Sequence, residues 1–171
     1  MLEVYKTKLK GVLRIIPPTH FHDHRGDYIE LYNELLYNES GVKTKFVQED
    51  ISISHKNVLR GIHGDNQTWK LISCLYGNLF LNVINLNHKS PEYKMYSSFV
   101  LEPGNYQVLI PPKFGNGHIA LSEPSIFHYQ QSTYYNRKKQ FTVLWNNSEL
   151  KLYWPIKDPI LSDRDRGIIN V

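Results

Sequence analysis

The sequence predicts an all-β fold, a jelly-roll barrel with one or two short helices, in a single domain of residues 1–171. Short runs rich in β-branched and aromatic residues recur along the whole chain. Turn residues separate these runs, as in Gly77-Asn78 between two apolar segments and Pro103-Gly104-Asn105 at a corner. Many short strands in one domain fit a sandwich or a barrel. A jelly roll is favoured because it encloses a cavity for a small ligand.

Each expected element follows from a local pattern. One helix is expected near residues 30–37, where Leu31, Leu35 and Leu36 keep helical spacing. In the first clear strand, Phe46, Gln48, Asp50 and Ser52 share one face. The expected strands are residues 46–54, 58–63, 69–76, 79–86, 106–110, 126–131 and 140–145.

Composition limits the classes of partner. The net charge of +4 and the pI near 9.0 suit an anionic ligand. The one basic cluster, Arg137-Lys138-Lys139, fits a solvated turn better than a nucleic-acid surface, so no nucleic acid is expected. A single cysteine, Cys74, excludes an internal disulfide and fits a reducing compartment. No signal peptide or membrane-length apolar run is seen, and a soluble cytoplasmic protein is therefore expected.

The segment Val58-Leu59-Arg60-Gly61-Ile62-His63 places polar side chains where its apolar neighbours predict a buried interior. Histidine has an ordinary pKa of about 6.5 and exchanges protons near neutral pH. His63 is therefore a candidate base, and Arg60 is a candidate anchor for an anion. A structural core histidine is the alternative for His63 taken alone.

Several motifs then resemble one known family. The run from Phe46-Val47-Gln48 to His63 resembles the dTDP-4-dehydrorhamnose 3,5-epimerases, which are cupin-type jelly rolls that work without a metal. The likeness continues in order over almost the whole chain. It includes Asp23-His24-Arg25-Gly26, Trp69-Lys70-Leu71, Ser90-Pro91, Tyr129, Tyr134-Tyr135, Leu144-Trp145-Asn146, Trp154-Pro155 and Leu161-Ser162 with Asp165.

The resemblance implies a reaction and a set of catalytic residues. Epimerisation beside a ketone needs a base on one face of the sugar, a donor or cation for the enolate oxygen, and an acid on the opposite face. By resemblance, His63 is the base and Asp165 orients its ring. Tyr129 matches the acid, and Lys70 matches the residue that polarises the C4 carbonyl. For Asp165 the alternative is an exposed carboxylate in a charged run.

The resemblance also implies substrate contacts and an assembly. Arg25 and Arg60 match diphosphate and nucleotide contacts, since a guanidinium fork suits phosphate oxygens. Glu30 and Gln48 match positions that bond the base or groups near it. No metal and no other cofactor is implied. The family's sites are completed by strand exchange, so a homodimer is expected.

Departures from the rhamnose pattern favour one branch of the family. The rhamnose enzymes carry Phe-Ala-His-Gly-Phe where this chain has Phe114-Gly115-Asn116-Gly117-His118, so Asn116 and His118 become candidate substrate contacts. The base His63 is followed by Gly64-Asp65 in place of an aromatic residue and glutamine. These features are similar to epimerases of GDP-activated 4-keto-heptoses in capsular polysaccharide synthesis. A dTDP-hexose 3,5-epimerase and a 3,4-ketoisomerase are the enzymatic alternatives.

Two readings from other classes also remain. The spacing of Gly104, Pro111, Gly115 and His118 loosely resembles a motif of metal-binding cupins, and the triplet His20, His22 and His24 could supply ligands to a metallo-oxygenase. His63 lacks the second histidine that such a site needs, and imidazoles without a convergent third or fourth ligand make a poor site. A non-catalytic sugar-nucleotide binding module would leave the catalytic set without use.

Overall fold

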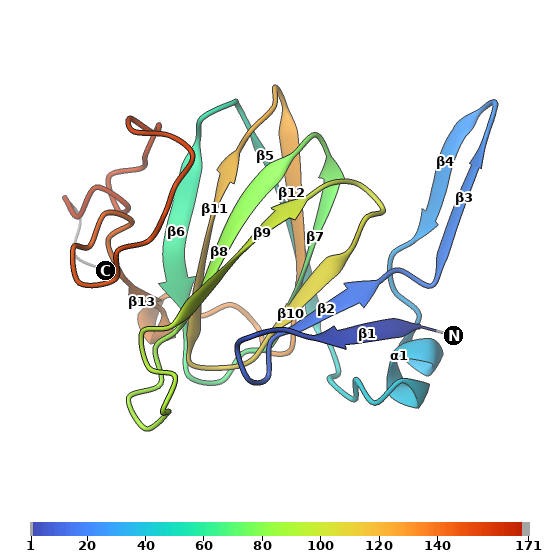
Figure 1. Ribbon diagram of the computed structural model, residues 1–171, viewed down its shortest axis with the longest axis horizontal. Coiled ribbons are helices and arrows are strands. Elements are labelled where there is room, and N and C mark those ends of the chain that lie inside the picture. Colours follow the sequence, from blue (N-terminus) through green and yellow to red (C-terminus); the bar gives the residue numbers. More distant parts are fainter. Residues whose placement is uncertain (1, 169–171) are drawn as a thin grey trace.

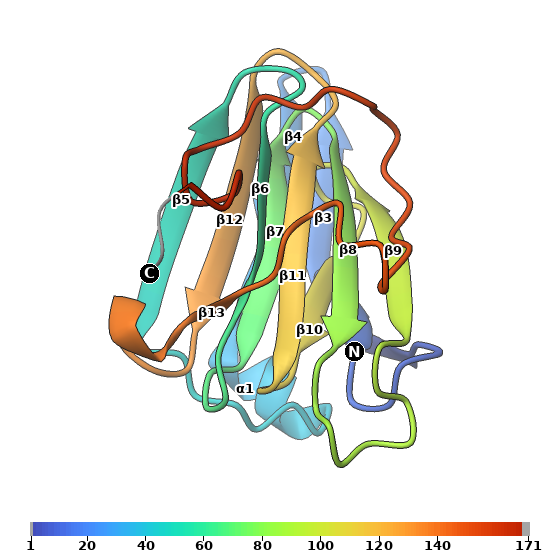
Figure 2. The ribbon, with the colours of Figure 1, turned by 90° about the vertical axis from the view of Figure 1, so that its left-hand side faces the viewer.

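The computed structural model describes residues 2–168, and they form two antiparallel sheets that face each other (Figures 1 and 2). The six-stranded sheet has the order β1 (Glu3–Lys6), β2 (Leu13–Ile16), β10 (Gln107–Ile110), β7 (Lys70–Tyr76), β12 (Ser125–Gln131) and β5 (Gln48–Ser54). The five-stranded sheet has the order β13 (Phe141–Thr142), β6 (Leu59–Gly64), β11 (Phe114–Ala120), β8 (Leu79–Asn85) and β9 (Tyr96–Leu101). The predicted all-β barrel is confirmed, and the strand-exchanged dimer stays a prediction.

Three apolar clusters hold the two sheets together and cover their outer faces. The cluster between the sheets contains Ile72, Leu81 and Val108, which are fully buried. Outside the five-stranded sheet, Leu150 and Trp154 of the C-terminal segment pack against it and so cover its outer face. On the outer face of the six-stranded sheet, residues of the segment that contains the helix pack against strands β2, β7 and β10 to make the third cluster. Each Å² of apolar surface that these contacts remove from water stabilises the fold by about 25 cal/mol.

The predicted helix is displaced along the chain. It was expected over residues 30–37, and α1 spans Glu34–Glu39. Residue 30 instead ends a strand, and the helix begins after Asn33, whose side chain accepts a hydrogen bond from the N–H of Leu36 at 3.3 Å. An asparagine N-cap of this kind sets the helix start more firmly than leucine spacing does.

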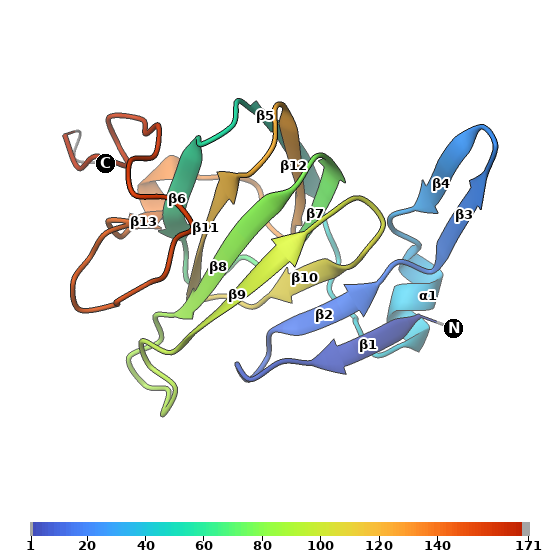
Figure 3. The same ribbon diagram turned by 45° about the horizontal axis from the view of Figure 1, so that its top comes forward.

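Six of the expected strands are found with their ends moved by at most two residues, as β5, β6, β7, β8, β10 and β12. The strand expected at 140–145 shrinks to β13, and a 3-10 helix, η1 (Arg137–Lys139), precedes it. Strands β1, β2, β9 and β11 were not predicted. A hairpin of β3 (Thr19–Asp23) and β4 (Gly26–Glu30) was also missed, and it projects away from the two sheets (Figures 1 and 3).

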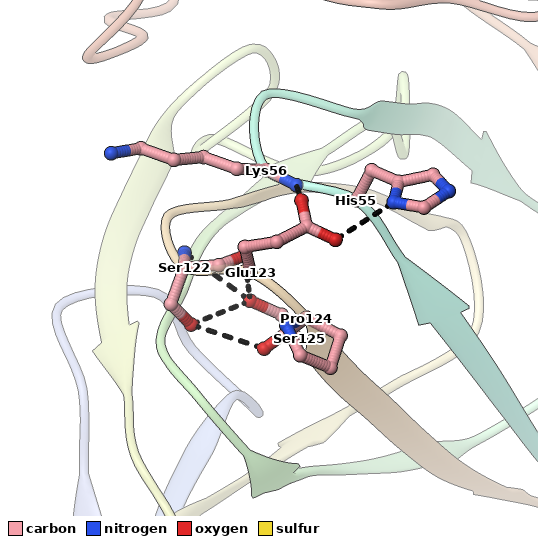
Figure 4. A network of polar contacts seen from close by, with 6 residues as sticks. All are labelled: His55, Lys56, Ser122, Glu123, Pro124 and Ser125. Atoms are coloured by element: carbon pink, nitrogen blue, oxygen red, sulfur yellow. Dashed lines mark hydrogen bonds and ion pairs between the residues drawn. The ribbon is translucent and has the colours of Figure 1, made fainter.

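Two loops are tied together at one end of the barrel (Figure 4). The Glu123 carboxylate, in the β11–β12 loop, accepts a hydrogen bond from the N–H of Lys56 at 2.6 Å. Its other oxygen lies 2.7 Å from Nδ1 of His55. The connection between β5 and β6 is thereby held against the connection between β11 and β12. These contacts fix the position of β5 and β6 relative to β11 and β12 at this end of the barrel.

Within residues 2–168 no helix has the length and apolar character needed to cross a bilayer.

Candidate active site

A cavity of about 420 Å³ opens between the two sheets. Strands β5, β7 and β12 form one wall, β6 and β11 form the other, and the turn at 162–165 borders it. Eight of the ten residues proposed from the sequence line this cavity: Gln48, Arg60, His63, Lys70, Asn116, His118, Tyr129 and Asp165. Residues distant in sequence are therefore gathered in one place that can hold a small molecule.

A bulge in β6 brings Arg60 and His63 to the same cavity. Side chains three residues apart on a regular strand face opposite ways. Here Arg60 pairs with His118 and His63 pairs with Asn116, so three steps on β6 oppose two steps on β11. The extra residue re-aims the strand. Gly61 makes this possible, because it has φ +125° and a Cβ there would lie 2.5 Å from Cα of Gly117.

His63 is paired with a buried carboxylate. Its Nε2 lies 2.6 Å from Oδ1 of Asp165, whose residue is 3% exposed. The second oxygen of Asp165 accepts a hydrogen bond from the N–H of Gly61 at 3.4 Å. A carboxylate only accepts hydrogen bonds, so it selects the tautomer with the proton on Nε2 and leaves the Nδ1 lone pair free to act as a base.

The pKa of Asp165 favours this role. Burial acts to raise that pKa, but the hydrogen bond and charge of His63, together with hydrogen bonds from Ser162 and the N–H of Gly61, outweigh burial, and the pKa lies below its ordinary value. The carboxylate is therefore ionised at neutral pH and can stabilise an imidazolium. The prediction of an exposed carboxylate, the alternative for Asp165, is excluded by its burial.

Lys70 is the buried cation of the cavity. It begins β7 and its Nζ donates a hydrogen bond to Oδ1 of Asn116 at 3.3 Å. Burial lowers the pKa of Lys70 to about 8, with Asp65 opposing the decrease and Arg164 adding to it. An ammonium whose proton is this labile, in a site of low dielectric, can polarise a carbonyl and support negative charge on its oxygen.

Tyr129 reaches the cavity from the sheet opposite His63. It lies on β12, where it pairs with Asp50 of β5 and Ile72 of β7. Burial raises the pKa of Tyr129 to about 12, and the charges of Asp50 and Tyr135 add to the effect. The phenol therefore carries its proton at neutral pH and can donate it into the cavity.

His118 is a neutral ring in the wall of the cavity. It stacks on Phe127 with ring centroids 3.8 Å apart and an angle of 6° between the planes. Burial, with a smaller contribution from the positive charge of Arg60, lowers the pKa of His118 to about 3. The imidazole stays uncharged at neutral pH. It can therefore exchange a hydrogen bond with a ligand but cannot serve as a cationic anchor.

Comparison with known proteins identifies the family. A family model described as dTDP-4-dehydrorhamnose 3,5-epimerase matches residues 6–171. The chain belongs to this family. It is accordingly an enzyme of the isomerase class, an epimerase of nucleotide-activated 4-keto sugars.

Relatives and solved structures cover nearly the whole chain. The dTDP-4-dehydrorhamnose 3,5-epimerase of Salmonella typhimurium is 36% identical, over 96% of this chain and 93% of its own length. The Shigella flexneri enzyme is 32% identical with the same coverage. The structure of the Bacillus anthracis enzyme with TDP and PPi bound has a TM-score of 0.91 and 32% identity, covering 97% of both chains. A Legionella pneumophila epimerase in complex with dTDP-4-keto-L-rhamnose has a TM-score of 0.91 and 28% identity, covering 98% of this chain and 91% of its own.

These relatives bear on the sequence-based preference for a branch. They are named as enzymes of dTDP-sugars, and they support the dTDP alternative better than the GDP-heptose reading. A role in capsular polysaccharide synthesis is likewise not supported by them.

Two residues that the family resemblance assigns as substrate contacts lie outside the cavity of this chain. Arg25, at the tip of the β3–β4 hairpin, is exposed and pairs with Asp23 at 2.6 Å. Glu30, at the end of the same hairpin, accepts hydrogen bonds from Thr19 and Asn33. The structure does not bring either residue to His63. Their assignment as substrate contacts stays a prediction that requires a second copy of the chain.

The histidine triplet also lies on this hairpin. His20 and His22 both contact Oδ1 of Asp27, at 2.8 and 3.1 Å. Among residues 2–168 no three His, Cys, Asp or Glu side chains are grouped as metal ligands would be. His20 and His22 instead share one exposed carboxylate.

Sequence reasoning missed several residues of the cavity wall. Asp50 and Ser52 had a usable signal, because they alternate with Gln48 on one face of β5. Arg164 had only a weak signal, since it stands in the charged run beside Asp165. Its guanidinium donates to Oγ1 of Thr142 through Nε and Nη2, at 2.9 and 2.8 Å.

Proposed function

We propose that this protein epimerises a dTDP-activated 4-keto-6-deoxyhexose at C3 and C5. The observation that carries the proposal is the arrangement around one cavity. His63, paired with Asp165, comes from the five-stranded sheet, and Tyr129 comes from the six-stranded sheet facing it. Both faces of a sugar ring held between the sheets can be reached. The family match and the relatives' dTDP-sugar substrates support the same choice.

In the proposed reaction the protein removes one proton from each of C3 and C5 and adds one proton to the opposite face of the same carbon. Nδ1 of His63 takes the proton from the carbon beside the C4 ketone, and the C–H electron pair forms the enolate. The Lys70 ammonium stabilises the enolate oxygen, and the Asp165 carboxylate stabilises the imidazolium. Tyr129 then donates its proton to the opposite face of the same carbon. Exchange with water then removes the added proton from His63 and returns a proton to the Tyr129 phenolate.

The nucleotide is proposed to lie toward the open side of the cavity. Arg60 is exposed there, and its Nε donates to Ser54 Oγ at 3.1 Å, which leaves its terminal nitrogens for phosphate oxygens. Gln48 is positioned by Asp50 and by the N–H of Tyr135, each at 2.8 Å. Both residues fit the contacts proposed from the sequence.

We further propose that a homodimer completes the site in the cytoplasm. The β3–β4 hairpin carries Phe21 and Tyr28, which are 69% and 66% exposed. Exposed aromatic rings on a projecting hairpin fit a surface that another copy of the chain covers. Such an exchange would carry Arg25 and Glu30 to the cavity of the partner.

A GDP-activated 4-keto-heptose is the second candidate substrate. Two departures in the cavity wall favour it, because Asn116 and His118 line the cavity where the rhamnose pattern has histidine and phenylalanine. A third departure, Asp65 after the base motif, lies behind the wall. Histidine in place of phenylalanine makes the wall more polar, which suits a sugar with an additional hydroxyl. The metal-dependent oxygenase and the binding module have no observation in their favour.

The test is incubation with dTDP-4-keto-6-deoxyhexose and GDP-4-keto-heptose in heavy water, followed by NMR. Deuterium at C3 and C5 of the dTDP-sugar, with inversion, is the expected result. Label only at C3 would indicate a single epimerisation, and movement of the ketone to C3 would indicate a ketoisomerase. Label in the GDP-heptose alone would select the second candidate. Tight binding of both sugars without any label would overturn the assignment as an epimerase.

A further inference from the structure

Asp65 is a buried carboxylate that the proposed reaction does not use. It directly follows β6 and is 7% exposed. Its Oδ1 accepts hydrogen bonds from the N–H groups of Gln67 and Thr68, at 2.8 and 2.7 Å. Its Oδ2 accepts from Nε2 of Gln140 at 2.7 Å. Every side-chain partner is a donor, which is the environment of an ionised carboxylate rather than of a neutral acid.

The same carboxylate begins the short connection to Lys70. The two backbone bonds fold residues 65–68 into a turn of the Asx type, and the bond from Gln140 ties that turn to the chain just before β13. The backbone carbonyl of Asp65 also accepts a hydrogen bond from the N–H of Lys113, before β11, at 2.8 Å. Asp65 therefore fixes the entry to β7, where Lys70 is the first residue.

Lys70 needs a negative charge nearby that its direct contacts do not supply. Its ammonium donates a hydrogen bond to the neutral amide of Asn116. Within residues 2–168 no carboxylate lies within 4.0 Å of its ammonium nitrogen. A buried ammonium without a compensating charge is costly and tends to lose its proton. The Asp65 charge favours the ammonium, while the Arg164 guanidinium opposes it.

We propose that Asp65 is a positioning residue for Lys70: its carboxylate fixes the 65–70 segment and supplies the charge that keeps a buried ammonium aimed at the substrate's carbonyl oxygen. The inference rests on the proposed epimerase reaction, in which Lys70 supports the enolate. It explains why an acid occupies this position behind the cavity wall, although it does not line the cavity.

Other charged groups surround this pair and define what a pH experiment measures. Lys139 of η1 contacts the same turn through Oε1 of Gln67, at 3.1 Å. The remaining titratable groups of the cavity are Asp50, Arg60, His63, His118, Tyr129, Tyr135, Arg164 and Asp165. Burial places the pKa of Tyr129 at about 12 and that of His118 at about 3, well away from the pKa of Lys70 at about 8. We assign a loss of activity near pH 8 to Lys70, and its disappearance in Lys70→Met tests that assignment.

The variant Asp65→Asn separates charge from shape. An asparagine keeps an oxygen for the two N–H groups, and Gln140 can turn its amide to present an oxygen to the new NH₂. The fold is retained while the negative charge is removed. We expect the ratio of kcat at pH 8.5 to kcat at pH 6.5 to fall about threefold relative to the parent protein, with activity at pH 6.5 within about threefold. Asp158→Asn, an exposed change away from the cavity, is the matched control.

A second readout does not depend on turnover. Lysines carrying isotope-labelled methyl groups are titrated by NMR, and Lys70 is assigned by the signal lost in Lys70→Met. The Lys70 midpoint is expected to move to lower pH in Asp65→Asn and to stay in place in Asp158→Asn. An unchanged midpoint in Asp65→Asn would overturn the inference. Failure of the parent protein to label any sugar, with the midpoint still displaced, would instead reject the proposed reaction and leave the coupling of Asp65 to Lys70 standing.

Discussion

Replacing Asp165 by asparagine tests the central pair of the cavity with almost no change in shape. The carboxylate lies 2.6 Å from Nε2 of His63 and is 3% exposed. An amide placed there can turn its NH₂ toward the ring. Nε2 would then have to accept, and the proton would move to Nδ1, the nitrogen that must be free to act as a base. Asp165→Asn should therefore block the base through its tautomer as well as through lost charge.

The magnitude follows from two contributions. Losing a hydrogen bond to a charged group costs about 1.5–3 kcal/mol, which corresponds to about 10- to 150-fold in rate. The wrong tautomer adds to this loss, and in a serine protease triad the same exchange of carboxylate for amide lowers kcat by about 10⁴-fold. We therefore expect kcat for deuterium entry to fall by between about 10² and 10⁴-fold.

The assay is the initial rate of deuterium entry into the sugar, measured by NMR at pH 7 with saturating substrate. Thermal unfolding of each variant checks that the fold is retained, since the asparagine oxygen can still accept from the N–H of Gly61. Asp163→Asn, an exposed change two residues away, is the control and should label at the parent rate. A rate for Asp165→Asn within about threefold of that control would refute the reasoning about the tautomer.

Three further variants test other parts of the account. Tyr129→Phe should slow net inversion by about 10²-fold while proton loss continues, so that deuterium exchange exceeds product formation; equal slowing of both would argue against an acid role. Lys70→Met should lower kcat by about 10²-fold or more and remove the loss of activity near pH 8, and a retained alkaline limb would assign that limb elsewhere. Gly61→Ala should reduce the free energy of unfolding by more than about 2 kcal/mol in urea denaturation, because its Cβ would lie 2.5 Å from Gly117. Gly41→Ala, where φ is +87° and nothing lies within 4 Å, should cost less; equal losses would mean that backbone conformation alone decides.

Some features of the fold and site could be predicted because the residues next to them in the sequence determine whether they are buried. Lys70 follows Trp69 and precedes Leu71 and Ile72, so burial of the cation could be expected, and the structure confirms it. Cys74 stands in the same apolar run and is buried as expected, with the pKa of its thiol raised to about 11 by burial. For these residues, apolar neighbours in the sequence are enough to predict burial.

Other features depend on contacts that no local pattern records. Strand β11 has the sequence Phe-Gly-Asn-Gly-His-Ile-Ala, and its two glycines argue against a strand. The structure explains them, because a Cβ at Gly115 would lie 2.6 Å from Ile62 of the neighbouring strand. The β6 bulge is similar, since regular alternation would have turned Arg60 away from His63. Asp165 sits in a charged run that resembles an exposed turn, and only packing against β6 buries it.

The hairpin shows a limit of another kind. The resemblance assigns Arg25 and Glu30 to the site, yet Arg25 lies in the turn between β3 and β4 and Glu30 ends β4, apart from the cavity. A contact proposed between two copies of a chain cannot be placed from the fold of one copy, although the exposed rings of Phe21 and Tyr28 fit such a contact. Sedimentation of the intact protein measures whether it is a dimer. Comparing the substrate affinity of the Arg25→Ala variant with that of the parent protein measures whether Arg25 contacts the substrate.

The account depends most on His63 as the group that takes the proton from carbon, and His63→Asn tests it most directly. Deuterium entry into the 4-keto sugar and affinity for dTDP are measured on the same preparation, the second by calorimetry. We expect no detectable label in the sugar and an affinity within about threefold of the parent value, because His63 is assigned to the sugar and not to the nucleotide. Deuterium entry at the parent rate in His63→Asn would contradict the account and place the base elsewhere in the cavity.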